Sequence, residues 1–457
     1  MCQPGRVLYL GIRPYSHYKP PMEAKKTSIA ANTILKFPNE IATYQQGENV
    51  VVVSPKDGNW LVLTKSQLEF FEKLRHGEAI GNVLSNAQNK NDALALLKQI
   101  IARDFTEKPL SISDRTTKVL FYLTYDCNLQ CEHCYMYGQQ SKANTLSVAE
   151  YSDIFANLKG NGVTEATFSG GEPLMRPGFW QIIDAAYKTG LSCKVFSNGT
   201  LWSDYDIERA KEYAIKAQIS IDGIDEPSCA IVRGAHVFER AKATALKLAN
   251  AGLEIEIATT PIAANIDAIE HGYADFVRDL KEKSRNTIQF KVSQNLLPGR
   301  NISQLSQSQK QDYSQRGIHL YQIANPGGSQ IPFFDEYRSG RGRIACGLGR
   351  LVFTPDGFVY ICSRLNSFPM LGNVRDLGVT GALAAAKERL AAASVDNTIP
   401  CRDCALRHIC GGGCRAERFE YVSSSKQKLS IHKPCSDAYK TTLVKMMIQA
   451  TKECYSW

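Results

Sequence analysis

The chain has 457 residues, of which 44% are hydrophobic and 22% charged, so it can form about three globular domains with a large apolar core. Its formal net charge is +9, but no block of five Lys and Arg residues and no nucleic-acid-binding motif accompanies this surplus, so no nucleic-acid partner is expected. No apolar run approaches the roughly 18 residues of a membrane span, and the N-terminus lacks the apolar core of a secretion signal, so neither a membrane partner nor export is expected.

The 14 cysteines occur mostly in groups with short spacings. In a small secreted protein they would indicate disulfides, whereas in a long chain without a signal sequence such groups are typical of metal binding. We therefore expect a reducing compartment, the cytoplasm.

The first third of the chain predicts a small α+β unit. Residues 1–35 show no periodicity and are expected to form an irregular arm. Asn49–Val53 and Trp60–Leu63 are β-rich runs around a segment with Pro, Asp and Gly, which is typical of a hairpin. A capping-box pattern at 64–67 predicts a helix that ends near Gly77.

A second helix is expected over 92–105, so that a hairpin followed by helices covers roughly 38–108. This winged-helix-like unit resembles the recognition element that binds the leader of a ribosomally synthesised precursor peptide. Such modules pair the leader as an added strand at a sheet edge. A structural remnant without binding function and an unrelated cap are the alternatives.

From residue 118 onward, apolar runs alternate with amphipathic runs, which is the pattern of βα units with a parallel sheet. Strands are expected near 118–126, 165–169, 192–197, 217–222, 253–260 and 287–293. Helices are expected near 147–159, 178–189, 204–214, 237–252 and 266–282. The predicted fold class is therefore α/β.

Three cysteines follow the first of these strands, at Cys127, Cys131 and Cys134, with the spacing C-x3-C-x2-C. Three thiolates at such spacings can hold three irons of a 4Fe–4S cluster and leave the fourth iron open. The loop would lie at the C-terminal end of a strand, where α/β barrels carry their chemistry. A zinc site or a disulfide-bonded group is the alternative.

With the aromatic Tyr135 directly after it, the motif resembles that of the radical S-adenosylmethionine (SAM) superfamily, and the resemblance spans roughly residues 116–300. It implies a partial (β/α)6 barrel. It also implies that the open iron binds SAM and that the reduced cluster cleaves SAM to a 5′-deoxyadenosyl radical, which abstracts hydrogen from a substrate. The three cysteines would be both metal ligands and catalytic residues, and Tyr135 would belong to the cofactor site.

The second strand is followed by Gly170, Gly171, Glu172 and Pro173. Two glycines let the backbone approach a ligand closely, and the glutamate supplies an acceptor for an ammonium group. The segment matches the superfamily's Gly-Gly-Glu-Pro motif, which implies that it holds the amino group of SAM. An ordinary turn is the alternative.

Polar residues also follow the third and fourth strands. Asn198 lies in a Ser-Asn-Gly segment, and Ser220 and Asp222 lie in a Ser-Ile-Asp-Gly segment. The resemblance places Asn198 near SAM and Ser220 against its ribose or carboxylate, with Asp222 in support. Arg233 is the implied partner of the SAM carboxylate, for which Arg240 competes. A polar turn is the alternative for the segment at Asn198.

Seven further cysteines form a second pattern. The first two bracket a predicted hairpin with a Pro-Asp-Gly turn, at Cys346 and Cys362. The others follow at Cys401, Cys404, Cys410, Cys414 and Cys435. Three consecutive glycines at 411–413 would let the backbone wrap around a bulky centre. A zinc ribbon, the alternative, needs only four cysteines.

This pattern resembles the SPASM domain of peptide-modifying radical SAM enzymes, which implies two auxiliary 4Fe–4S clusters and three clusters in all. The resemblance assigns the outer cluster to Cys401, Cys404, Cys410 and Cys435. It assigns the inner cluster to Cys346, Cys362 and Cys414. No eighth cysteine lies between 346 and 362, so the fourth ligand of the inner cluster is open.

A polar stretch at 300–345 is expected to link these parts, and Asp437–Tyr455 is predicted as a closing helix packed against its own domain. The predicted organisation is an N-terminal arm and recognition-element-like domain at 1–110, a radical SAM partial barrel at 116–300, a linker at 301–345, a SPASM domain at 346–440 and a C-terminal helix at 441–457.

We therefore expect a cytoplasmic radical SAM/SPASM maturase that abstracts hydrogen from a precursor peptide and gives a C–C or C–S crosslink or excises part of the backbone. The expected partners are the precursor, with leader and core, an electron donor such as flavodoxin or ferredoxin, and a separate leader-binding protein if the N-terminal unit does not bind the leader itself. No acid or base for the reaction is assigned.

Two other functions stay open. One is a formylglycine-generating enzyme of the sulfatase-maturase type, which acts on a protein Cys or Ser. The leader-binding-like unit and the missing eighth cysteine argue against it. The other is a non-enzymatic iron–sulfur electron-transfer protein, which would have no use for the motifs at Glu172, Asn198 and Ser220.

Overall fold

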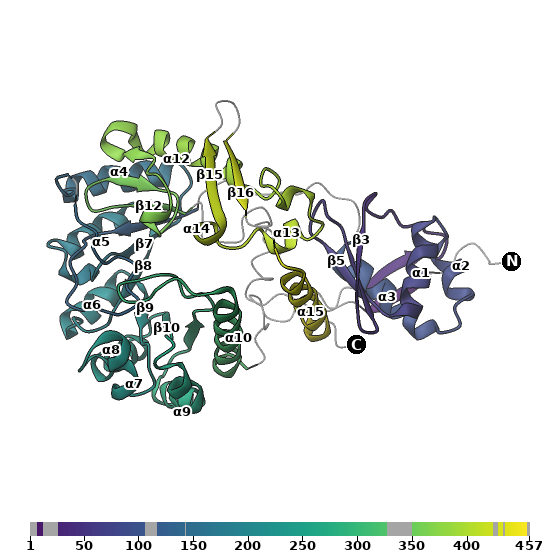
Figure 1. Ribbon diagram of the computed structural model, residues 1–457, viewed down its shortest axis with the longest axis horizontal. Helices are drawn as coiled ribbons and strands as arrows, with labels where there is room; N and C mark the ends of the chain where they lie inside the picture. The colour runs from purple at the N-terminus through teal and green to yellow at the C-terminus, as the bar shows by residue number, and fades with distance from the viewer. Residues whose placement is uncertain are drawn as a thin grey trace. The chain divides into compact units, whose positions relative to one another are not determined.

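The computed structural model describes residues 7–11, 26–105, 117–141, 143–326, 350–423, 428–432 and 435–454. These residues form two compact units. The first contains the described residues before 114 and those from 392 onward, and the second contains 117–326 with 350–391. Figure 1 colours both units by residue number.

The second unit is built on a sheet with the strand order β11-β10-β9-β8-β7-β6-β12-β13-β14. Six neighbouring strands run parallel in chain order: β6 (Lys118–Tyr122), β7 (Glu165–Ser169), β8 (Ser192–Ser197), β9 (Lys216–Ser220), β10 (Ile255–Thr259) and β11 (Ile288–Val292). The predicted strands and the parallel α/β sheet are thereby confirmed. The strand order begins at β11 and ends at β14, as in an open sheet.

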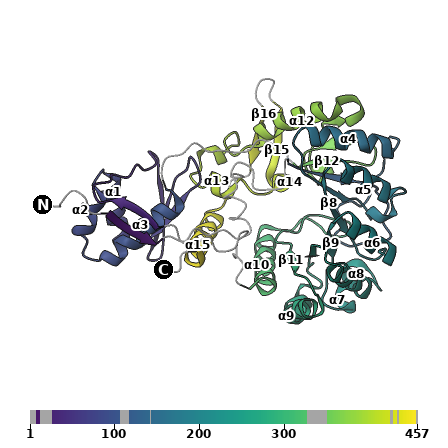
Figure 2. The ribbon, with the colours of Figure 1, turned by 180° about the vertical axis from the view of Figure 1, so that it is seen from behind.

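Helices connect these strands and cover the sheet. The five predicted helices are α4 (Val148–Gly160), α5 (Phe179–Lys188), α6 (Asp204–Glu212), α8 (Phe238–Asn250) and α9 (Ile266–Lys283). Three further pieces are the 3-10 turn η1 (Pro173–Met175), α7 (Glu226–Arg233) and α10 (Gln307–Ala324). Figures 1 and 2 both show α4, α5, α6 and α8 on the same side of the strands.

A hairpin from the C-terminal half of the chain extends this sheet. It consists of β12 (Leu351–Phe353) and β13 (Phe358–Tyr360), and is followed by the turn η2 (Leu365–Ser367), β14 (Gly372–Asn373) and α12 (Val374–Ala393). β12 pairs in parallel with β6, so that Leu351 lies opposite Val119 and Phe353 opposite Phe121. The predicted hairpin is confirmed, but its place beside β6 was not predicted.

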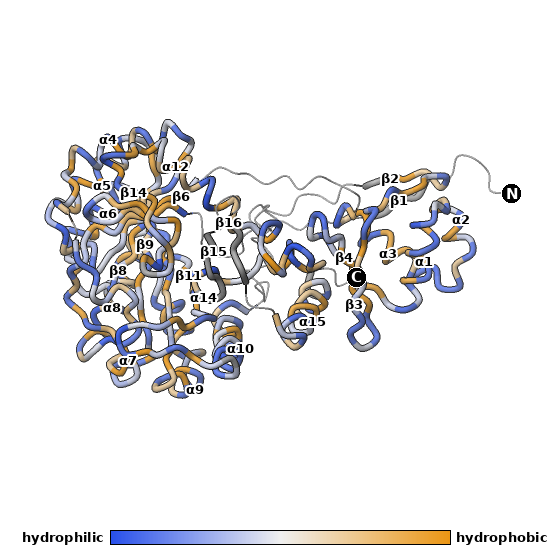
Figure 3. Tube along the Cα trace, turned by 45° about the horizontal axis from the view of Figure 1, so that its top comes forward, coloured by the Kyte–Doolittle hydropathy of each residue, from blue (hydrophilic) through white to orange (hydrophobic). Residues whose placement is uncertain are grey.

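The core of this unit follows the alternation of side chains along β6. Phe121 stacks on Phe168 and Phe353, with ring centroids 5.8 and 4.8 Å apart, and packs edge-on against Phe155 of α4. Leu120 and Tyr122 point to the opposite face. Figure 3 shows the hydrophobic residues concentrated along the strands.

The first unit contains a three-stranded antiparallel sheet, β3 (Ala42–Gln46), β4 (Asn49–Val53) and β5 (Trp60–Leu63), followed by α1 (Lys65–Arg75), α2 (Ile80–Ser85) and α3 (Lys90–Arg103). The predicted hairpin and both predicted helices are confirmed, and Thr64 and Gln67 make both bonds of the capping box. The arm differs from the expectation, because β1 (Val7–Gly11) and β2 (Lys26–Ala30) pair antiparallel within it.

The two faces of this sheet bury different partners, because its residues alternate in direction. Val50, Val52, Leu61 and Leu63 pack against α1, α2 and α3. Val51, Val53, Trp60 and Val62 pack instead against the end of the chain, α13 (Arg407–Cys410) and α15 (Asp437–Cys454). Figures 1 and 2 show α15 and α1–α3 on opposite sides of the sheet. The predicted closing helix is therefore packed, although on the N-terminal sheet.

The remaining elements of the first unit are η3 (Cys401–Asp403), α14 (Arg415–Arg418), β15 (Phe419–Ser423) and β16 (Lys428–His432). The segment 301–345, expected as a linker, differs in that it contains α10, which packs on α9 and β11; residues 327–345 lie outside the described residues. The cysteine-rich part expected at 346–440 is divided between the two units. No helix among the described residues is both long enough and apolar enough to cross a bilayer.

Candidate active site at the ends of strands β6 to β9

The three predicted cluster cysteines lie on the loop between β6 and α4. Cys127 is exposed, Cys134 half-buried and Cys131 buried. The sulfur of Cys127 lies 4.0 Å from Nδ2 of Asn198, and the sulfur of Cys131 lies 3.9 Å from Nη1 of Arg233. Burial raises the pKa of the Cys131 thiol to about 11, and the positive charge of Arg233 opposes that rise. Both partners are donors that favour a thiolate.

The glycine pair after β7 packs on the backbone that leads into the cysteine loop. The N–H of Gly171 donates to the carbonyl of Thr124 at 2.9 Å, and the N–H of Glu172 donates to the carbonyl of Asp126 at 2.8 Å. A Cβ on Gly171 would lie 2.1 Å from the Asp126 oxygen, and one on Gly170, whose φ is +142°, would lie 2.3 Å from the Thr124 oxygen. The close approach that these glycines permit is therefore to the cysteine loop itself.

Glu172 is fully buried beside these glycines. Its carboxylate accepts hydrogen bonds from Oγ of Ser197 and the N–H of Asn198, each at 2.8 Å, and from the N–H of Leu174 at 3.4 Å. Burial raises the pKa of Glu172 to about 7, and these donors limit the rise. Pro173 follows as the buried first residue of η1. A carboxylate surrounded mainly by neutral donors fits the predicted role of receiving an ammonium group.

Asn198 connects the end of β8 to the cysteine loop. Its Nδ2 donates to Oδ1 of Asn128 at 2.9 Å, and Nδ2 of Asn128 donates to Oγ1 of Thr200 at 2.8 Å. Oδ1 of Asn198 accepts from the N–H of Thr200 at 2.9 Å and from its hydroxyl at 2.7 Å. This ring of three polar side chains fixes the residue directly after Cys127.

Asp222 connects the end of β9 to the same loop from the other side. It is fully buried, and its Oδ2 lies 2.7 Å from Nε of Arg233 and 2.7 Å from Nε2 of His133. Oδ1 accepts from the N–H of Thr260 at 2.6 Å. Burial alone would raise the pKa of Asp222, but the charges of Arg233 and His133 hold it at about 2. Arg233, expected as a SAM partner, is thus already paired with Asp222.

Ser220 is the last residue of β9 and is half-buried. Among the described residues, no hydrogen bond joins its hydroxyl to the other predicted site residues. Tyr135 is 37% exposed, and its ring centroid lies 4.3 Å from the guanidinium carbon of Arg364, two residues past Cys362. Arg240, the competing arginine, donates to the carbonyl of Thr200.

A segment after β11 closes over the cysteine loop. The N–H of Arg300 donates to the carbonyl of Cys134 at 3.0 Å, and the N–H of Asn301 donates to that of Glu132 at 2.8 Å. A Cβ on Gly299 would lie 2.4 Å from the carbonyl oxygen of His133. The ends of β6, β7, β8, β9 and β11 therefore all contact this one loop.

The family model of the Radical SAM superfamily matches residues 121–270, which include β7 to β10 and the whole cysteine loop. Residues 121–270 therefore form a radical SAM domain. The resemblance stated for the cysteine motif is thereby confirmed.

Curated relatives of the chain include two maturation proteins. The chain is 26% identical over 267 residues to the sporulation killing factor maturation protein SkfB of Bacillus subtilis, covering 54% of this chain and 63% of that protein. It is 25% identical over 312 residues to the mycofactocin maturase MftC of Mycolicibacterium smegmatis, covering 65% and 77%. The chain thus spans less than two thirds of the first relative.

The fold also matches the crystal structure of Streptococcus suis SuiB bound to S-adenosylmethionine, with a TM-score of 0.50 at 15% identity, over 84% of this chain and 96% of that one. At this identity the match shows the shared fold alone. A radical SAM domain implies a SAM-binding 4Fe–4S cluster.

The residues of the radical SAM domain fit such a cluster. Three thiols lie on one loop, two of them beside the N–H donors of Asn198 and Arg233. Thiolate ligands with hydrogen-bond donors at the sulfurs are typical of iron–sulfur sites. In the part of the chain that the structure describes, no three His, Cys, Asp or Glu side chains converge as around a single metal ion.

The cysteines assigned to the outer auxiliary cluster are gathered in the first unit. Burial raises the pKa of Cys401 to about 12, and the neighbouring thiols of Cys410, Cys435 and Cys404 raise it further. Cys410 and Cys404 also belong to the core beneath the N-terminal sheet. Cys401 therefore feels the charge of the other three predicted cysteines, although no three of these side chains converge as around a single metal ion in the described part of the chain.

The described residues do not bring together the cysteines that are assigned to the inner cluster. Cys362 lies in the second unit and Cys414 in the first, whereas Cys346 is outside the described residues. The glycines before Cys414 also differ from the expectation. They wrap around the fully buried Arg415, which donates to the carbonyls of Gly411 and Gly413, and a Cβ on Gly412 would lie 2.4 Å from its Nη1.

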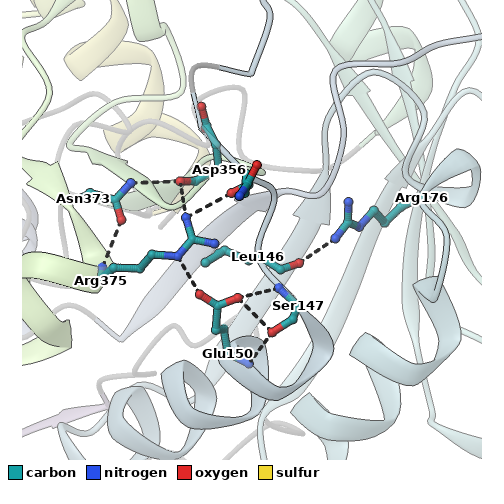
Figure 4. Close-up of polar contacts among 8 residues, drawn as sticks. Leu146, Ser147, Glu150, Arg176, Asp356, Asn373 and Arg375 are labelled. Carbon is teal, nitrogen blue, oxygen red and sulfur yellow. Dashed lines mark hydrogen bonds and ion pairs between the residues drawn. The ribbon is translucent and has the colours of Figure 1, made fainter.

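A polar network joins the radical SAM domain to the hairpin (Figure 4). Nε of Arg375 lies 2.6 Å from Oε1 of Glu150, and its Nη1 donates to the carbonyls of Asn144 at 3.0 Å and Asp356 at 3.2 Å. Nη2 of Arg176, just past η1, donates to the carbonyl of Leu146 at 2.6 Å. The turn of the hairpin is thereby held against the chain that leaves the cysteine loop.

Sequence reasoning missed four residues that hold the cysteine loop, namely Asn128, His133, Thr200 and Gly299. Asn128 and His133 lie inside the cysteine motif, where a polar residue between expected metal ligands was a usable signal. Thr200 and Gly299 belong to distant segments, and only the fold brings them to the loop.

Proposed function

We propose that the protein is a radical SAM enzyme that modifies a ribosomally synthesised precursor peptide. The radical SAM domain supports the chemistry, and the names of the relatives, a maturation protein for a sporulation killing factor and a mycofactocin maturase, support a peptide substrate. When bound, SAM and its 4Fe–4S cluster supply the 5′-deoxyadenosyl radical that takes a hydrogen atom from the substrate. The modified precursor would contain a C–C or C–S crosslink, or would have lost part of its backbone by excision.

The observation that carries this proposal is the cysteine loop with Asn198 and Arg233 at its sulfurs and the buried Glu172 beside it. Cys127, Cys131 and Cys134 would bind the cluster. The carboxylate of Glu172 would orient the SAM amino group, close to the same loop. The other proposed cofactor-site residues are Tyr135, Gly170, Gly171, Pro173, Asn198, Ser220, Asp222 and Arg233.

Two auxiliary 4Fe–4S clusters complete the proposal. The effect of Cys404, Cys410 and Cys435 on the pKa of the Cys401 thiol supports an outer cluster in the first unit. Cys346, Cys362 and Cys414 would hold the inner cluster. These centres would exchange electrons with the substrate, and an external donor such as flavodoxin or ferredoxin, in the cytoplasm, would reduce the SAM cluster.

The N-terminal sheet supports binding of the precursor's leader at β3. Both faces of the sheet are covered by apolar cores, so only its edges remain. At the β5 edge, the amide of Gln99 accepts from the N–H of Val62 at 2.7 Å and donates to its carbonyl at 3.1 Å, as a neighbouring strand would. Among the described residues, β3 pairs with β4 alone. A leader would add there as a fourth strand.

The first experiment is anaerobic reconstitution with iron and sulfide, followed by iron counting and an assay for 5′-deoxyadenosine with SAM and reductant. We expect about eleven to twelve irons, as three 4Fe–4S clusters require. Cys127→Ala abolishes nucleoside formation, whereas Cys193→Ala, at a buried cysteine outside both patterns, retains it. Stoichiometric zinc without SAM cleavage would refute the proposal.

The peptide substrate is tested separately, by mass spectrometry of candidate precursor peptides after incubation with reduced enzyme and SAM. A loss of two hydrogens, or of a backbone fragment, supports the proposed reactions. Proline at Thr43 or Gln45, two exposed positions of β3, should weaken binding of the leader because proline prevents strand addition. Formylglycine on a protein substrate would favour the sulfatase-maturase alternative.

A further inference from the structure

Tyr122 occupies a central position in the radical SAM domain. It is the last residue of β6, directly before the segment that leads to Cys127, and its side chain is fully buried. It packs in one apolar cluster with Leu120 and with Val352 and Tyr360 of the hairpin, and Cys134 packs against this cluster. The side chain thus lies between the cysteine loop and the hairpin that precedes Cys362.

The hydroxyl of Tyr122 contacts both of these segments. It donates a hydrogen bond to the carbonyl of Ser363 at 2.8 Å, and its oxygen lies 3.3 Å from the hydroxyl of Tyr135. Since a phenol has one proton, Tyr135 is the donor in the second bond. Ser363 directly follows Cys362, and Tyr135 directly follows Cys134. One buried hydroxyl therefore bonds to the neighbour of a cysteine on each side.

Arg364 adds a second connection between the same segments. Its guanidinium lies 4.3 Å from the ring centroid of Tyr135, in cation–π geometry, and its Nη1 lies 3.5 Å from the carbonyl oxygen of Pro298. Its backbone N–H lies 3.5 Å from the sulfur of Cys362. Two contacts therefore join the residues after Cys362 to the residues after Cys134. One is the buried hydroxyl of Tyr122, and the other is the partly exposed pair of Arg364 and Tyr135.

These contacts matter because the strand pairing ends before them. β12 pairs with β6 only from Leu351 to Phe353, and β13 ends at Tyr360. Beyond Tyr360 the Cys362 segment has left the ladder, so side-chain contacts must hold it against β6.

We propose that Tyr122 is a positioning residue that fixes the Cys362 segment against the Cys134 segment and so sets the distance from Cys362, as a proposed ligand of one iron–sulfur centre, to the loop that would hold the other. The role for the centres rests on the proposed function, whereas the mechanical link between the segments does not. If Tyr122 only filled the core, its hydroxyl would need a hydrogen-bond partner, but that partner would not have to join the Cys134 segment to the Cys362 segment.

Tyr151 provides a matched control. It is also fully buried, it packs beside Phe121 on the opposite face of β6, and its hydroxyl makes no hydrogen bond within the described part of the chain. Tyr122→Phe and Tyr151→Phe therefore remove the same atom from similar surroundings, and only the first removes a bond to the hairpin.

The test is amide hydrogen exchange, by mass spectrometry, of the full-length protein before and after reconstitution. In Tyr122→Phe we expect exchange to become about tenfold faster in peptides covering 133–141 and 361–373 together, because a lost buried bond raises local opening. Tyr151→Phe leaves both peptides unchanged. In reconstituted Tyr122→Phe, the spin–spin coupling between the reduced clusters should show a broader range of separations at unchanged iron content.

Equal exchange in Tyr122→Phe and Tyr151→Phe, or faster exchange in one segment alone, would overturn the proposal. If Tyr122→Phe does not fold, Arg364→Gln takes its place, because Arg364 is partly exposed and the same two peptides must still loosen together. The exchange of the iron-free protein decides the mechanical link even if the wild-type protein cleaves no SAM, so a failure of the proposed function is recognised separately.

Discussion

Two buried carboxylates in the candidate site have opposite electrostatic surroundings. Glu172 faces hydroxyl and amide donors, and its pKa is raised to about 7. Asp222 faces Arg233 and His133, and its pKa is held at about 2. Burial is the largest cause in both cases, but Asp222 is paired directly with Arg233 and His133, whereas Arg233 lowers the pKa of Glu172 less than the neutral donors around it do. Glu172 therefore makes no direct ion pair within the described residues, whereas Asp222 makes two.

This difference predicts a pH dependence of stability that Glu172 causes. Its pKa lies above the ordinary value of 4.5, so the folded state binds more protons than the unfolded state between pH 4.5 and 7, and stability falls as pH rises across that window. The fall attributable to Glu172 is about 2 to 4 kcal/mol. Urea unfolding of SAM-free protein at several pH values measures it, and Glu172→Gln should remove it. An unchanged slope in the variant would contradict this assignment.

Replacement of Asp222 should be far more damaging than replacement of a surface aspartate. Asp222→Asn leaves Arg233 buried without a countercharge, which costs about 3 to 5 kcal/mol. Asp279→Asn is the control, because Asp279 pairs with Lys242 and Lys283 at the surface, and it should cost about 1 kcal/mol or less. Urea unfolding compares them, and equal losses would refute the argument.

At the scale of elements, the strands and most helices could be predicted because their signals are local. The capping boxes at Thr64, Ser147 and Ser203 mark helix starts, and the apolar runs mark the strands. The pairing of β12 with β6 could not be predicted, because strand neighbours more than 200 residues apart leave no local pattern. Helix α10 was missed because its sequence is polar and lacks a clear apolar stripe.

The role of the glycine pair after β7 was likewise visible only in the fold, and it gives a third prediction. Gly171→Ala would place a Cβ 2.1 Å from the carbonyl of Asp126, so the cysteine loop must move. We expect a loss of about 1 to 3 kcal/mol and faster loss of reconstituted iron. Gly160→Ala, where nothing lies within 4 Å of the added carbon, should retain both. Similar iron loss from the two variants would contradict the prediction.

The network that joins α4 to the hairpin predicts a pH-dependent coupling (Figure 4). The hydrogen bond from Arg375, helped by Ser147, lowers the pKa of Glu150 to about 2. The contribution of ionised Glu150 to stability is therefore complete above pH 4.5, its ordinary pKa, and is lost as the pH falls toward 2. Both side chains are about one third exposed, so a double-mutant cycle of Glu150→Gln and Arg375→Gln should give only about 0.5 to 1 kcal/mol at pH 7. The coupling should decrease at pH 3, and an increase there would refute it.

At the scale of the whole molecule, the first unit combines the two ends of the chain. The N-terminal sheet buries Val51 and Val53 against Met447 of α15, and Nε1 of Trp60 donates to Oγ1 of Thr451 at 3.1 Å. The closing helix itself could be predicted from its composition. Its partner could not, because amphipathic patterns show that a face is buried but not which surface covers it.

Truncation of the fully buried Met447 tests this arrangement. Met447→Ala should cost about 2 to 5 kcal/mol, as expected for a large-to-small change in a core. Hydrogen exchange should accelerate in β4 and β5, whereas the strands of the radical SAM domain stay unchanged. Met370→Ala, at an exposed methionine, is the control. Acceleration in β6 to β9 instead would show that the two units do not unfold separately.

The dependence of the N-terminal sheet on α15 has a consequence for the order of events on the ribosome. A nascent chain emerges from its N-terminus, so β3, β4 and β5 leave the exit tunnel long before Asp437–Cys454 has been translated. Throughout that interval the face of the sheet that α15 covers in the complete protein has no partner. At typical elongation rates of about 5 to 20 residues per second, the interval lasts tens of seconds. The radical SAM domain can fold during this time. The proposed leader-binding sheet is completed last, so only full-length chains present it intact.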